Sequence, residues 1–144
     1  MNSLPSMDRN GLIEFLAAAT KAVSEGPPID MANAIVQTAG DEEFLKEIVS
    51  DLITETLQHY EQIRKAMPAR NVQACRFSAH SIKGAAANLY AKQLQHGAAA
   101  IEHLCKLALA GKLNEENWNN GVAALMKLLG QAIQAFRQKA QTMF

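Results

Sequence analysis

The hydrophobic positions of this chain recur every three or four residues, which is the spacing of one face of an α-helix. The clearest segment is 41–67, where apolar residues keep this spacing and three acidic residues come first. Acidic side chains are favoured at the positive N-terminal end of a helix, and Pro68 cannot continue one. Alternating runs bounded by hairpin turns, which would indicate strands, do not occur. The pattern therefore predicts an all-α chain.

Three further long helices follow from the same spacing and from their end signals. Segments 71–90 and 91–110 are each periodic, and Gly111 ends the second. Asn114 can cap a last helix that continues almost to the end of the sequence. Four helices of about 20 to 28 residues with short connections predict an antiparallel up-down four-helix bundle. The residues expected to face its core in the last two helices are Leu94, Ala98, Ile101, Leu104, Cys105, Val122, Leu125, Met126, Leu129, Ile133 and Phe136.

One or two shorter helices are predicted before the bundle. The first spans about 8–24, and Gly26, followed by two prolines, is expected to end it in a left-handed conformation. The second spans about 30–38, with Asp30 as its cap. Residues 1–7 are expected to be frayed.

We divide the chain into an N-terminal extension, 1–28, which is predicted to be helical, and a four-helix bundle, 29–144. The extension could be a structural cap, a dimerisation helix or part of a linker. Its apolar stripe favours packing on the end or side of the bundle.

Composition and charge narrow the class of protein. The 144 residues suit a single domain, and 49% of them are hydrophobic, which argues against disorder. The 14 basic and 14 acidic side chains balance, and no basic stripe supports binding to nucleic acid or to an anionic membrane surface. We expect a cytoplasmic protein, since neither a signal peptide nor a membrane span is evident. Cys75 and Cys105 lie in apolar patterns without CxxC spacing and are expected to be buried free thiols, with a disulfide between them as the alternative.

The segment 79–89, AHSIKGAAANL, places a histidine among small residues in the middle of a predicted helix. Ala79 and Ile82 belong to the apolar stripe, so His80 is expected to face solvent. The residues that share its stripe are Arg76, Lys83, Gly84 and Ala87.

This stripe suits chemistry at the histidine. A glycine inside a helix costs about 1 kcal/mol relative to alanine, so Gly84 indicates a need for open space beside the ring. Lys83, one turn away, favours a neutral imidazole, which is a nucleophile, and it could pair with the oxygens of a phosphoryl group. Two alternatives stay open: a surface histidine without function, and an adaptor face that binds a partner without phosphate.

Other candidates are weaker. His96 and His103 share a helix face with Glu102 nearby, but ligands two turns apart are too distant for one zinc ion, so we predict no metal site. Trp118 and Leu113 are predicted to form a hydrophobic contact at the start of the last helix. No ATP-binding loop is recognisable, which argues against autophosphorylation.

The histidine segment resembles the signature of histidine phosphotransfer (Hpt) domains: a small residue, His, any residue, an apolar residue, Lys, Gly and further small residues. The segment PIDMANAIVQTAGDEEFLKEIVSDLITETL, 28–57, resembles the family's leading helices, and LQHGAAAIEH, 94–103, resembles the helix after the motif. The likeness covers about residues 29–140.

The resemblance implies a four-helix bundle that relays phosphoryl groups in two-component signalling. His80 matches the phosphoacceptor, Lys83 the lysine that steadies the phosphoryl group, and Gly84 the glycine that lets a receiver domain dock. The implied partners are receiver domains of response regulators or a hybrid histidine kinase. The resemblance implies neither a cofactor nor a kinase or phosphatase site in this chain, because magnesium and the catalytic acidic residues belong to the receiver.

Two positions depart from the family pattern. Tyr90 stands where many members have glycine, so either the helix ends differently or Tyr90 lines the docking surface with Arg76 and Ala87. Glu102 stands where some members have a glutamine near the histidine. As a carboxylate it could hold a ring N–H of His80 or pair with Lys83.

Overall fold

The computed structural model describes residues 4–144, and within them it contains six helices and no strand. This confirms the all-α prediction. The helices are α1 (Arg9–Glu25), α2 (Met31–Gln37), α3 (Glu42–Ala66), α4 (Val72–Asn88), α5 (Lys92–Leu109) and α6 (Glu115–Met143).

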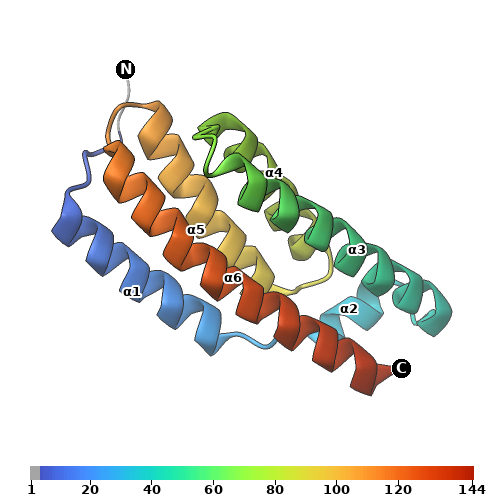
Figure 1. The fold of residues 1–144 in the computed structure, drawn as a ribbon. Coiled ribbons are helices and arrows are strands. Elements are labelled where there is room, and N and C mark those ends of the chain that lie inside the picture. Colours follow the sequence, from blue (N-terminus) through green and yellow to red (C-terminus); the bar gives the residue numbers. More distant parts are fainter. Residues whose placement is uncertain (1–3) are drawn as a thin grey trace.

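The four long helices α3 to α6 form the bundle, and α1 and α2 are the additional N-terminal helices (Figure 1). The most extensive packing joins α4 to α5, followed by α5 with α6 and α3 with α4, while α3 and α6 close the ring. Helix α1 lies along the outer side of α5 and α6, and α2 contacts the start of the bundle at α3 (Figure 1). The predicted architecture is confirmed; the division of the chain at residue 28 stays a prediction.

Polar caps decide where the helices begin. The side chains of Asp30 and Asn114 each accept a hydrogen bond from a backbone N–H three residues later, as predicted, and Asn71 caps α4 in the same way. Asp8 and Asp41 cap α1 and α3 in the same way. Each cap satisfies a backbone donor that the first helical turn leaves unpaired.

The core is built from the faces that the sequence spacing indicates. Every residue predicted to face inward on α5 and α6 is buried, and Trp118 and Leu113 are buried as well. Both cysteines are buried free thiols. Burial raises the pKa of Cys75 to about 12 and that of Cys105 to about 11. No helix within residues 4–144 is long and apolar enough to cross a membrane.

Two predictions about the N-terminal region are wrong. Gly26 has an extended backbone, with φ −93° and ψ 153°, instead of a left-handed one. The reason is Pro27, since the residue before a proline is pushed toward extended conformations. Residues 4–7 are not frayed: Leu4 and Met7 pack against the core, and the Met7 N–H donates to the Lys112 carbonyl at 2.8 Å. Residues 1–3 of the predicted frayed segment lie outside the described part.

Candidate functional site

His80 projects outward from the middle of α4. Its neighbours Ala79 and Ile82 are buried in the core, while 66% of the His80 side chain is exposed. The predicted orientation of this histidine toward solvent is therefore confirmed. The exposure leaves the ring accessible to another protein.

Glu102 reaches the histidine from the neighbouring helix α5. One carboxylate oxygen, Oε2, lies 2.5 Å from His80 Nδ1, and the other, Oε1, lies 2.5 Å from Lys83 Nζ. The two contacts that the sequence left as alternatives are thus both present. A carboxylate can only accept hydrogen bonds, so Nδ1 carries the proton in this contact. In a neutral ring the lone pair then resides on Nε2.

The Glu102 carboxyl is held as a carboxylate although its side chain is only 4% exposed. Burial is the largest single influence on its pKa and raises it. Hydrogen bonds from Lys83 and His80, with the charges of Lys83 and Lys106, outweigh burial and lower the pKa below its ordinary value. The result is a buried anion directly beside the exposed ring.

Lys106 belongs to the same cluster and was missed by the sequence reasoning. Its Nζ lies 3.8 Å from Glu102 Oε1, and 43% of its side chain is exposed. The sequence does indicate this contact, because Lys106 follows Glu102 by four residues, which is the spacing of neighbours on one helix face. The charge nearest to the imidazole is that of Glu102, whose contact with the ring was one of the two alternatives that the sequence offered.

Arg76, Gly84 and Ala87 share the outer stripe of α4 with His80, as the spacing predicts. Arg76 is half-buried and forms no ion pair with any side chain in residues 4–144. A β-carbon at Gly84 would meet no atom within 4 Å, so internal packing does not require this glycine. Phe77, three residues before His80, is 65% exposed and was also missed.

Tyr90 is not brought next to the histidine. It lies two residues beyond Asn88, the last residue of α4, which is itself eight residues and therefore about 12 Å along the helix from His80. Its φ of 55° is in the left-handed region, which glycine adopts without strain. The turn that a glycine would favour is thus kept with a tyrosine, and the Tyr90 carbonyl accepts a hydrogen bond from the Asp30 N–H at 3.1 Å. A role for Tyr90 in docking stays a prediction.

The remaining candidates lie elsewhere. Within residues 4–144 no group of three or more His, Cys, Asp or Glu side chains is placed to hold a metal ion. The ring of His103 stacks on Phe15 of α1 with centroids 5.2 Å apart, and burial lowers its pKa.

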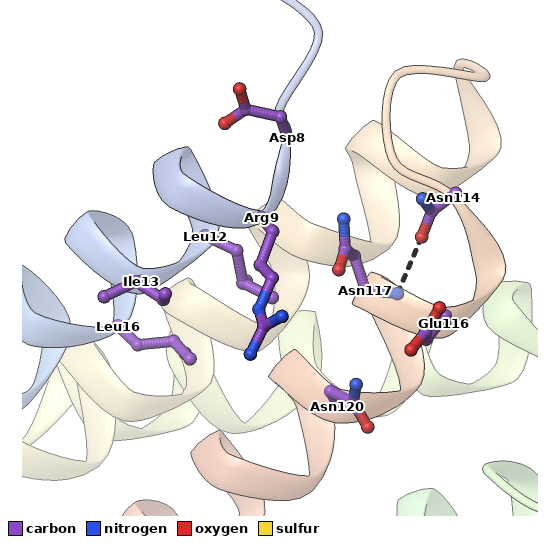
Figure 2. Close-up of a pocket in the computed structure, with 9 residues that line it drawn as sticks. All are labelled: Asp8, Arg9, Leu12, Ile13, Leu16, Asn114, Glu116, Asn117 and Asn120. Atoms are coloured by element: carbon purple, nitrogen blue, oxygen red, sulfur yellow. Dashed lines mark hydrogen bonds between the residues drawn. The ribbon is translucent and has the colours of Figure 1, made fainter.

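A groove of about 560 Å³ runs between the N-terminal halves of α1 and α6 (Figure 2). It is lined by Arg9, Leu12 and Asn117, among others, and by none of the candidate site residues predicted from the sequence. We therefore assign the candidate site to the cluster around His80.

One of the comparisons with known proteins identifies the family of this chain. A family model described as Hpt domain matches residues 47–139, which is more than half of the chain and includes the whole cluster around His80. Neither the curated proteins nor the solved structures contain a significant match.

Proposed function

Because the chain belongs to the Hpt domain family, we propose that His80 accepts a phosphoryl group and exchanges it with the aspartate of a receiver domain. Hpt domains carry out histidine phosphotransfer in phosphorelays, as intermediates rather than as kinases or phosphatases. His80 is the histidine that matches the family motif and, with 66% of its side chain exposed, it is open to a partner.

The observation that carries the proposal is the hydrogen bond between His80 Nδ1 and Glu102. It leaves Nε2 as the nucleophilic nitrogen. In the transfer, the Nε2 lone pair forms a bond to phosphorus, the bond from phosphorus to the aspartate oxygen breaks, and the aspartate leaves as a carboxylate. The ring gains positive charge as the new bond forms, and the Glu102 carboxylate at Nδ1–H stabilises that charge.

Lys83 has the complementary role at the phosphoryl oxygens. It lies one turn after His80 on the same helix, and 31% of its side chain is exposed. Its ammonium can therefore turn from Glu102 toward a phosphoryl group on Nε2 and offset the added negative charge. Arg76, Gly84, Ala87 and the exposed Phe77 would form the surface on which the receiver docks.

The proposed partner supplies the rest of the chemistry. A receiver domain, free or part of a hybrid kinase, would bring the aspartate and the magnesium ion, so this chain would need no cofactor. A cytoplasmic location belongs to the same proposal.

The test is phosphoryl uptake from phosphorylated receivers. Wild-type protein is expected to take up label that is labile in acid and stable in base, and a His80→Gln variant with intact helicity is expected to take up none. Binding of receivers without any label on the wild-type protein would instead support the adaptor alternative, in which Phe77 and Gly84 serve docking alone.

A further inference from the structure

Glu102 faces three basic groups, although two would suffice to pair both of its oxygens. His80 occupies Oε2, and Lys83 and Lys106 both approach Oε1, at 2.5 Å and 3.8 Å. We propose that Lys106 is a positioning residue that takes over Oε1 when Lys83 turns to the phosphoryl group. This inference rests on the proposed function of His80.

The burial of Glu102 makes such a replacement necessary. Its side chain is 4% exposed, and an ionised carboxylate in that position is costly when it loses a partner. The departure of Lys83 would leave Oε1 without its only hydrogen-bonded cation among the described residues. A replacement cation at the same oxygen removes most of that cost.

Lys106 is placed where it can replace Lys83 at Glu102 Oε1. At 3.8 Å its ammonium is too far for a hydrogen bond but within ion-pair distance, so a rotamer adjustment of about 1 Å would bring it into contact. It projects from the same helix as Glu102, one turn later, and 43% of its side chain is exposed, so it can move without disturbing the core.

The charge change on phosphorylation drives the exchange. A phosphoryl group adds about 1.5 to 2 negative charges beside Lys83. It therefore attracts the Lys83 ammonium more strongly than the single charge of Glu102 does. As Lys83 moves outward, Lys106 closes on Oε1, and Glu102 keeps its hydrogen bond to Nδ1–H. When the phosphoryl group leaves for a receiver aspartate, Lys83 returns to Oε1 and Lys106 moves back.

The experiment measures forward and reverse single-turnover transfer between a phosphorylated receiver and this protein. The ratio of the two rate constants gives the equilibrium constant for phosphoryl occupancy of His80. The variants are Lys106→Met, which keeps the aliphatic stem, and Lys106→Arg, which keeps the charge. Lys127→Met, at an exposed lysine of α6, is the matched control.

Lys106→Met is expected to lower the equilibrium constant about fivefold, near the upper limit for a partly exposed ion pair. The Lys106→Arg variant should have nearly the wild-type equilibrium constant, and the Lys127→Met variant should have the wild-type value. In a Glu102→Gln background Lys106→Met should not change the equilibrium constant further, because a neutral glutamine offers Lys106 no carboxylate to pair with. A purely structural role at the end of α5 would change the free energy of unfolding but not this constant.

Two results would overturn the inference while leaving the proposed function intact. One is a Lys106→Met variant that exchanges phosphate like wild type and Lys127→Met. The other is an undiminished effect of Lys106→Met in the Glu102→Gln background, which would mean that Lys106 contacts the phosphoryl group directly. Failure of wild type to take up phosphate would overturn the proposed function, and this inference with it.

Discussion

Replacing Gly84 separates its effect on the stability of α4 from its effect on the docking of a receiver domain. Gly84 lies inside α4, it is exposed, and a β-carbon there would meet no atom within 4 Å. Glycine at an exposed interior helix position is about 1 kcal/mol less favourable than alanine, and glutamine is close to alanine. Gly84→Ala and Gly84→Gln are therefore both expected to raise the free energy of unfolding, by about 1 kcal/mol and slightly less.

The same substitutions should affect phosphotransfer differently. Gly84 follows His80 by four residues, so their positions on the helix surface are about 5 to 6 Å apart. A glutamine side chain would occupy the space beside the ring that a receiver must enter. We expect Gly84→Gln to slow transfer at least about tenfold, equivalent to about 1.4 kcal/mol, while Gly84→Ala has a smaller effect.

Urea denaturation and single-turnover phosphotransfer measure the two effects. Gly121→Ala is the control for stability, because its β-carbon would lie 2.7 Å from Leu104 Cδ1 and 2.9 Å from Leu12 Cδ1. That variant should be destabilised. A Gly84→Gln protein that transfers phosphate at the wild-type rate would refute the assignment of this glycine to docking. A Gly84→Gln protein that is less stable than wild type would refute the conclusion that the space beside Gly84 is open.

Substitutions at three other positions test the site and its surroundings. Lys83→Ala should slow phosphotransfer and leave the far-ultraviolet circular dichroism unchanged, because this partly exposed side chain pairs with Glu102 without belonging to the core. The pKa of Glu102 is lowered by folding, so its contribution to stability is present above its unfolded value, near 4.5, and is lost as the pH falls through the folded value. The difference in unfolding free energy between wild type and Glu102→Gln should accordingly shrink on acidification below about pH 4.5, and a constant difference would contradict the pairing. Tyr90→Gly should be more stable than Tyr90→Ala by about 1 kcal/mol in urea denaturation, because φ is 55° at this position; equal stabilities would rule out backbone strain there.

The helices could be predicted from the sequence because their signals are local. A cap such as Asn71 acts on the backbone three residues away, and the spacing of apolar residues in α5 and α6 indicates which face is buried. The direction of His80 follows from the same local logic, since its neighbours Ala79 and Ile82 belong to the core. These features depend on no other helix.

The contacts of Glu102 could not be decided in this way. His80 and Glu102 are 22 residues apart, and whether the carboxylate meets the ring, Lys83 or both depends on how α4 and α5 are placed against each other. Packing between the helices determines that placement. Tyr90 shows a second limit: its side chain gives no sign that the backbone must be left-handed, and only the structure shows that the turn is kept.

The most direct test of the central claim is to find which atom carries the phosphorus. Protein containing ¹⁵N-labelled histidine would be phosphorylated by a receiver and observed by nuclear magnetic resonance, with His80→Gln as the control. Our account predicts a bond from phosphorus to Nε2 of His80, with the proton of Nδ1 held by Glu102. Phosphorus on Nδ1, on one of the other three histidines, or on no histidine would contradict it.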